Sequence, residues 1–168
     1  NLTIDFGVYP SAFYSIGNRV WNDNGAGGGT PSYGLHNGDD PGIQGVIVRL
    51  YADTDTDGVP DSTTPLANTT TDADGYYLFD ELPQGNYIVS IAASNFGSAG
   101  ALGGFGVTIQ PSGNEGDANN DTDHTSDHAI STVDPDFGIY SGRYTLGGTE
   151  PENETDATIA GAPQDPGT

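Results

Sequence analysis

Glycine and proline interrupt this chain so often that no amphipathic helix of useful length fits between them. The 168 residues include 26 Gly and 11 Pro, and both residue types disfavour the interior of a helix. Between these interruptions, apolar and polar residues alternate with a period of two, as in a strand that buries one face. In residues 2–9, for example, one face carries Leu2, Ile4, Phe6 and Val8. The sequence therefore predicts an all-β protein.

The alternating segments are short and are separated by turn sequences such as Asp-Gly and Pro-Gly. About seven short strands at this spacing are typical of a β-sandwich. We expect strands at 2–9, 13–21, 43–51, 75–80, 86–92, 104–110 and 128–140. We assign 1–12 to an N-terminal linking or donor strand, 13–140 to the sandwich, and 141–168 to an irregular C-terminal linker or tail rich in Gly and Pro steps.

A pentapeptide near the start of the chain is repeated near its end. Asp-Phe-Gly-Val-Tyr at 5–9 returns as Asp-Phe-Gly-Ile-Tyr at 136–140, and 14–17 resembles 144–147. We therefore expect one complete domain and one extra strand, which needs a sheet to pair its backbone. Three arrangements are open: the extra strand pads its own domain, completes a preceding domain, or is donated to another subunit.

Acidic residues outnumber basic residues by 24 to 3, and lysine, cysteine and methionine are absent. The net charge of −21 makes nucleic acid a poor partner. Without cysteine there are no disulfides and no thiolate metal sites. No apolar run approaches the roughly 18 residues of a membrane helix, so we expect no membrane insertion.

The acidic residues are clustered. A chain this acidic is often disordered, whereas halophilic acidity would spread the acids evenly over the sequence. Clusters with the spacing of cation ligands favour a folded, cation-dependent domain instead.

One cluster has the D-x-D-x-D-G-x-x-D spacing of a calcium loop. Alternate side chains can place three carboxylates around one hard cation, the glycine permits a sharp turn, and the residue after it can offer its carbonyl oxygen. Thr64 stands where a full EF-hand has its bidentate acid, so water or another segment must complete the shell. We expect Ca²⁺ ligands at Asp53, Asp55, Asp57, Val59 and Asp61.

Further oxygen-rich segments are candidates for the same chemistry, so we expect several Ca²⁺ ions. Two histidines in the last segment are outnumbered by carboxylates, which favours calcium over zinc. The segments flanking a glycine-rich stretch contain Asn22, Asp23, Asn24, Asp39 and Asp40; a short turn contains Asp72 and Asp74; and the last segment contains Asp117, Asp121, Asp123 and Asp127.

The chain has no signature of a common enzyme class. A nucleophile elbow, a phosphate-binding loop and a dinucleotide fingerprint are all absent, so we expect no enzymatic activity. Glycosylation sequons fit an extracellular location, and they occur at Asn1, Asn68, Asn120 and Asn153.

Five segments follow one another in an order found in one family of domains. They are IGNRVWND at 16–23, DPGIQGV at 40–46, TDADGYYLF at 71–79, LPQGNYIV at 82–89 and DFGIY at 136–140. Together they resemble the B domains of serine-aspartate-repeat surface adhesins. The resemblance implies an immunoglobulin-like (collagen-adhesin-B or prealbumin-like) β-sandwich that binds several Ca²⁺ ions and serves as a rigid stalk module outside the cell. Related pilus domains carry Lys–Asn crosslinks, which a chain without lysine cannot form.

We therefore expect a structural subunit or stalk module of an extracellular, calcium-stabilised fibre or surface filament. Its partners would be copies of itself in a homopolymer, or adjacent repeats of the same chain, with units joined head to tail by strand complementation. The alternative is an adhesin or carbohydrate-binding module of a multidomain cell-surface protein, in which a sugar would stack on Trp21, Tyr33, Tyr76 or Tyr77.

Overall fold

The structure, a computed structural model, describes residues 13–32, 39–108 and 132–147. Within these ranges the chain forms short strands and two single-turn 3₁₀ helices, and no helix there is long and apolar enough to cross a membrane. The strands are β1 (Tyr14–Arg19), β2 (Ile47–Ala52), β3 (Ala67–Thr70), β4 (Tyr76–Leu82), β5 (Gly85–Ile91), β6 (Ile139–Tyr140) and β7 (Tyr144–Leu146), and the 3₁₀ helices are η1 (Ala26–Gly28) and η2 (Ala93–Phe96).

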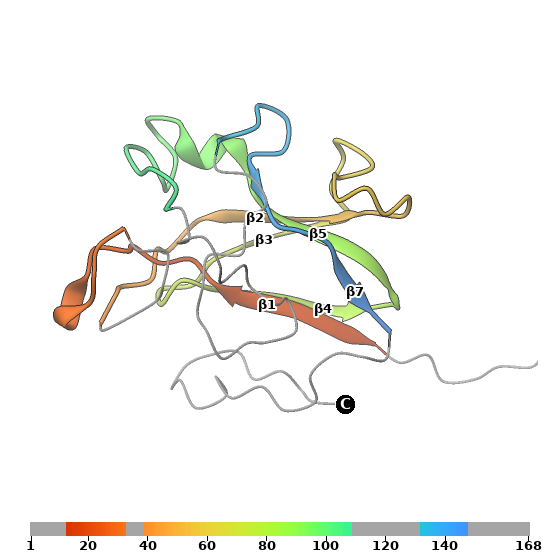
Figure 1. The fold of residues 1–168 in the computed structure, drawn as a ribbon, viewed down its shortest axis with the longest axis horizontal. Coiled ribbons are helices and arrows are strands. Elements are labelled where there is room, and N and C mark those ends of the chain that lie inside the picture. Colours follow the sequence, from red (N-terminus) through yellow and green to blue (C-terminus); the bar gives the residue numbers. More distant parts are fainter. Residues whose placement is uncertain (1–12, 33–38, 109–131, 148–168) are drawn as a thin grey trace, which may run out of the picture.

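The strands form two antiparallel sheets that face each other (Figure 1). One sheet pairs β1 with β4, and the other has the order β3-β2-β5-β6, with β7 also paired to β5. Strands β6 and β7 share one edge of β5, where Ile139 lies opposite Ile91 and Leu146 lies opposite Gly85. The predicted all-β, immunoglobulin-like sandwich is confirmed.

The hydrophobic core lies between the two sheets. Alternate residues of β2 and the segment before it face inward, and the side chains of Val46, Val48 and Leu50 have no exposed surface. This is the period-two pattern that identified 43–51 as a strand. From the other strands, the core cluster takes Phe79, Leu82, Tyr87, Val89 and Leu146.

The strands predicted at 13–21, 43–51, 75–80 and 86–92 are present as β1, β2, β4 and β5. The strand predicted at 104–110 is wrong over 104–108, where Phe105 donates its N–H back to Leu102 in a turn and is 42% exposed. From 128–140, the described part forms only the two residues of β6. The segment 2–9, with Leu2, Ile4, Phe6 and Val8, lies outside the described residues.

Two strands were not predicted. Strand β3 is almost entirely polar, Ala-Asn-Thr-Thr, and its outward residues are exposed, so it shows no apolar alternation. Strand β7 corrects the linker or tail assignment over 141–147, because Tyr144–Leu146 pair with β5 and Leu146 is buried in the core, whereas 148–168 lie outside the described residues. Three residues are too short a signal to stand out in a Gly- and Pro-rich segment.

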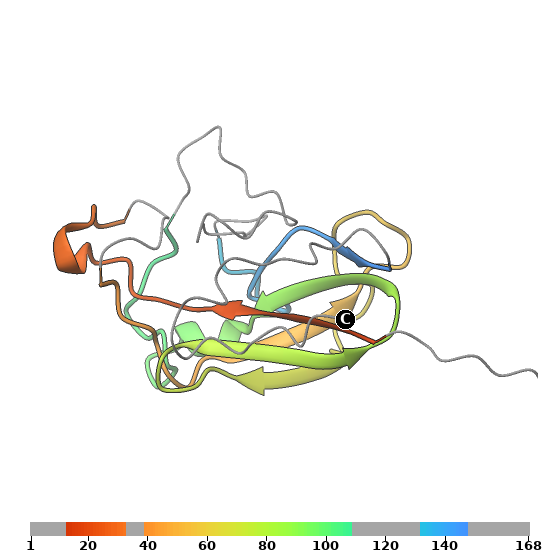
Figure 2. The same ribbon diagram turned by 90° about the horizontal axis from the view of Figure 1, so that it is seen from below.

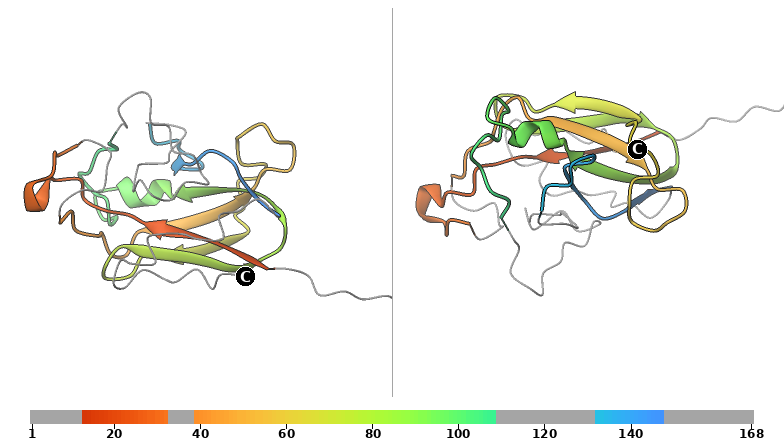
Figure 3. Two further views of the ribbon diagram at one scale, coloured as in Figure 1. Left: turned by 60° about the horizontal axis from the view of Figure 1, so that its bottom comes forward. Right: turned by 90° about the horizontal axis from the view of Figure 1, so that it is seen from above.

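The chain enters and leaves the sandwich at the same end. Strand β1 begins with Tyr14 opposite Leu82, and β7 ends with Leu146 opposite Gly85, so both points flank the β4–β5 hairpin. The loop between β2 and β3 projects from this end too, because Ala52 at the end of β2 lies opposite Tyr87 near the start of β5. Figures 2 and 3 show the same arrangement from other directions.

Candidate metal centre

The loop that follows β2 is folded around the carboxylate of Asp53. This side chain has no exposed surface, and its oxygens accept N–H groups from Asp57 (3.1 Å) and Gly58 (3.2 Å). The backbone turns sharply here, with φ of 67° at Thr56 and 80° at Gly58. Glycine adopts such a positive φ without strain, so the position of Gly58 in the sequence motif is explained by the geometry of the turn.

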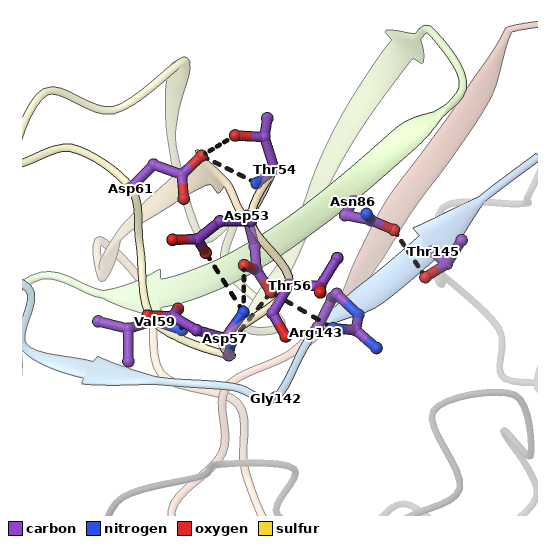
Figure 4. A network of polar contacts seen from close by, with 12 residues as sticks. Asp53, Thr54, Thr56, Asp57, Val59, Asp61, Asn86, Gly142, Arg143 and Thr145 are labelled. Atoms are coloured by element: carbon purple, nitrogen blue, oxygen red, sulfur yellow. Dashed lines mark hydrogen bonds and ion pairs between the residues drawn. The ribbon is translucent and has the colours of Figure 1, made fainter.

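Three carboxylates converge in this loop, of which Figure 4 labels Asp53 and Asp61. One carboxylate oxygen each from Asp53, Asp55 and Asp61 lies within 4.8 Å of the others, and no other such group of three carboxylate or histidine residues is present in the described ranges. Asp53 is buried, whereas Asp55 and Asp61 are exposed. Clustered anionic oxygens repel one another, and they are the ligands that Ca²⁺ prefers. The donor set therefore fits a hard divalent cation.

Asp57 and Val59 take part in hydrogen bonds within the loop. The N–H of Asp57 is directed to Asp53 and Asp55, and one oxygen of its carboxylate accepts the N–H of Val59 at 2.8 Å. Asp57 is thus outside the convergent group. Its role as a ligand, and that of the Val59 carbonyl, stay predictions.

Asp61 is oriented by Thr54, a residue that was not among the predicted site residues. One carboxylate oxygen of Asp61 accepts the Thr54 hydroxyl at 2.6 Å and the Thr54 N–H at 2.8 Å. The hydroxyl bond first, and then the backbone bond, lower the pKa of Asp61 below its usual value of 3.8. Asp61 is therefore ionised, as a cation ligand must be. A threonine between two aspartates carries no signal that would have revealed this role.

Arg143 also reaches the loop from the segment between β6 and β7 (Figure 4). Its Nη1 donates to the Thr56 carbonyl oxygen at 2.8 Å and lies 3.9 Å from Asp53 Oδ2. Arg143 was not predicted as a functional residue, because 141–168 were assigned to a linker or tail outside the sandwich. The scarcity of basic residues, three in the whole chain, was a signal that could have drawn attention to it.

The two acidic segments that flank the glycine-rich stretch, at 22–24 and 39–40, lie close together. Asp40 is 2% exposed and accepts the N–H of Gly25 at 2.9 Å, while the Asp39 N–H donates to the Ala26 carbonyl at 3.0 Å. The Asn24 side chain accepts the Ala26 N–H at 2.9 Å. The predicted ligands Asn22, Asp23, Asn24, Asp39 and Asp40 therefore lie around one loop base, and residues 33–38 between them lie outside the described residues.

The turn with Asp72 and Asp74 lies next to these two segments rather than next to the loop at 53–61. The Asp72 carboxylate accepts the N–H groups of Asp74 and Tyr76, both at 2.9 Å, which is the bonding of an ordinary hairpin turn. Gly42 packs so closely on the Asp74 carbonyl that a Cβ would not fit there. Since the carboxylates of this region do not converge in the described ranges, cation binding here stays a prediction.

The other predicted sites are only partly described. Asp117, Asp121, Asp123 and Asp127, and the sequons at Asn1, Asn120 and Asn153, lie outside the described residues. Asn68 is exposed on β3. Of the aromatic residues considered for sugar stacking, Tyr76 is 6% exposed with the Arg19 guanidinium over its ring, and Tyr77 contacts Phe79 edge to face. The ring of Tyr76 is therefore not available as an open platform.

Comparison with known proteins gives one consistent result. The family model of the SdrD B-like domain matches residues 14–142. A fibrinogen-binding protein of Staphylococcus epidermidis is 35% identical over 144 residues, which is 86% of this chain and 11% of that protein. Serine-aspartate repeat-containing protein D of Staphylococcus aureus (strain Newman) is 31% identical over 169 residues, covering 96% of this chain and 11% of that protein.

Serine-aspartate repeat-containing protein I of Staphylococcus saprophyticus is 42% identical over 89 residues, which is 53% of this chain and 4% of that protein. The chain thus spans between 4% and 11% of the length of these relatives.

Proposed function

Because the chain belongs to the family of SdrD B-like domains, we propose that it is a structural module of a multidomain cell-surface protein, stiffened by Ca²⁺. Its location is extracellular, as the sequence predicted, and its role is mechanical rather than catalytic. The family resemblance and the small fraction of each relative that this chain spans support a module that acts as one part of a longer assembly.

The observation that carries the calcium proposal is the convergence of Asp53, Asp55 and Asp61 within 4.8 Å. These residues would hold the ion, and the sequence motif adds Asp57 and the Val59 carbonyl. The loop is tied to the sandwich at both ends, since the Asp53 N–H donates to the Asn86 carbonyl and the Asp61 N–H donates to the Ala52 carbonyl, both at 3.1 Å. A cation that neutralises the loop would therefore stabilise the ends of β2 and β5.

We also propose that units associate through the strand at 2–9, with adjacent repeats of the same chain or with further copies of it. The repeated pentapeptide of the sequence supports this idea, because the extra copy needs a sheet to pair with. The alternative, a ligand-binding module, draws on the name of the fibrinogen-binding relative. The buried ring of Tyr76 argues against a sugar platform on that residue.

The calcium proposal is tested by thermal unfolding of the wild type in CaCl₂ and in EGTA. A cation present at 100 times its Kd stabilises the folded state by about 2.7 kcal/mol, so the Tm should rise by several degrees. Asp53→Asn should abolish most of this rise. Asp80→Asn, which makes the same charge change at an exposed position on β4, should keep it. An identical Tm in CaCl₂ and EGTA would refute the proposal.

A further inference from the structure

Arg143 brings a positive charge to a loop built from carboxylates. Its Nη1 is 3.9 Å from Asp53 Oδ2. The Asp53 side chain has no exposed surface, and it is one of the ligands in the calcium proposal. The same nitrogen donates to the Thr56 carbonyl at 2.8 Å. One guanidinium group therefore both compensates loop charge and satisfies a loop carbonyl.

The backbone on both sides of Arg143 is held by hydrogen bonds to β5. On one side, the Ser141 N–H donates to the Val89 carbonyl (2.9 Å), and the Val89 N–H donates to the Ser141 hydroxyl (3.0 Å). On the other side, β7 begins at the next residue and pairs with β5. The β6–β7 edge of the sheet thus positions this charge.

A divalent cation in the loop would lie close to this guanidinium group. An ion that binds Asp53 Oδ2 at the usual Ca²⁺–O distance of about 2.3–2.6 Å would be within about 6.5 Å of Arg143 Nη1. That separation is shorter than the Debye length of about 8 Å at physiological ionic strength. The two positive charges therefore repel each other, and both are attracted to the same carboxylate.

We propose that Arg143 is an internal counter-cation of the loop: it stabilises the cation-free loop and competes with the divalent ion, and so sets the affinity of the site. This inference rests on the proposed function. It predicts two effects of opposite sign when the charge is removed, namely lower stability without the ion and higher affinity for it. If Arg143 only supported the fold of the loop, its removal would lower both the stability without the ion and the affinity for the ion.

The local probe is the amide of Gly58, whose N–H donates to Asp53. Its NMR shift is followed during a CaCl₂ titration of the wild type, Arg143→Gln and Arg143→Lys. The Gln variant should bind Ca²⁺ between about 5-fold and 100-fold more tightly and should have a lower Tm in EGTA. The Lys variant, which keeps the charge, should bind like the wild type. Arg19→Gln makes the same charge change near the opposite end of the sandwich and should leave the affinity within about 2-fold.

Unchanged or weaker binding by Arg143→Gln, with a normal Gly58 response in the wild type, would overturn the role of Arg143 and leave the calcium proposal standing. No Gly58 response in the wild type or in Arg143→Gln would overturn both. If the Gln variant does not fold, the competition can still be tested on the wild type alone. The side-chain N–H signals of Arg143 should shift with the same CaCl₂ midpoint as Gly58, and signals that do not move would contradict competition.

Discussion

The carboxylate of Asp61 is held in its charged form by one neighbouring residue. Two bonds from Thr54 favour its charged form and lower its pKa below 3.8. Because the pKa in the folded state is below that in the unfolded state, the contribution to stability is present above the unfolded value. It is lost as the pH falls through the folded value. Protons and divalent cations therefore compete at this oxygen only under acidic conditions.

Removal of the Thr54 hydroxyl tests this account. In Thr54→Val, the carboxylate of Asp61 keeps the backbone bond but loses the bond that lowers its pKa most, so the pKa should rise toward 3.8. The measurement is a pH titration of the Asp61 carboxyl carbon by NMR, without divalent cations. Thr54→Ser retains the hydroxyl and should titrate like the wild type. Equal pKa values in Thr54→Val and the wild type would show that the hydroxyl has no such effect.

Gly58 is a second residue whose contribution can be isolated, because Gly45 provides a matched control. Their φ values are 80° and 79°, and a Cβ at either position would meet no atom within 4 Å. An alanine at either position should therefore cost only backbone strain, about 1–2 kcal/mol. Only Gly58→Ala should also weaken Ca²⁺ binding, since only Gly58 shapes the loop around Asp53. Chemical unfolding in EGTA and CaCl₂ separates the two effects, and equal Ca²⁺ responses would contradict the assignment.

The elements differ in how far the sequence could predict them. The loop at 53–61 could be found because its three converging carboxylates lie within nine residues, so their spacing in the sequence indicates that they can meet. Strand β3 could not be predicted, because it pairs with β2 without an alternation of apolar and polar residues. The grouping of 22–24 with 39–40 depends on a loop base that joins Asp40 to Gly25, and such long-range contacts leave no local pattern. Asp57 shows the limit even within a motif, because local hydrogen bonds, not spacing, decide where its carboxylate points.

Strand β7 gives the element-scale prediction. If Tyr144–Leu146 belong to the sandwich, Leu146→Ala should destabilise the domain by about 2–5 kcal/mol, because the side chain is 6% exposed and packs in the core. Thr145→Ala, at an exposed neighbour, should cost far less. Urea unfolding of the two variants makes the comparison. Equal stabilities of Leu146→Ala and the wild type would show that Tyr144–Leu146 do not belong to the sandwich and are part of a linker or tail.

At the scale of the whole molecule, a net charge of −21 disfavours the compact state by self-repulsion. NaCl should screen this repulsion and raise the Tm in EGTA. If the calcium proposal holds, the rise in Tm with NaCl should be smaller in CaCl₂, because bound Ca²⁺ would already neutralise the most crowded carboxylates. A Tm that depends on NaCl as steeply with CaCl₂ as without it would favour general halophilic acidity over specific cation sites.

The entrance and exit of the chain at one end of the sandwich also determine how the domain would respond to force. Tension applied through the residues that flank 13 and 147 acts on β1 at Tyr14 and on β7 at Leu146, which both adjoin the β4–β5 hairpin. The hydrogen bonds of these strands would then open one after another, like a zipper, rather than share the load as in shear. From Leu146 the opening would first break the side-chain bond that Thr145 donates to Asn86, and would then pass Tyr144 and arrive at Arg143. Tension along this path would therefore release the guanidinium group from the loop at 53–61.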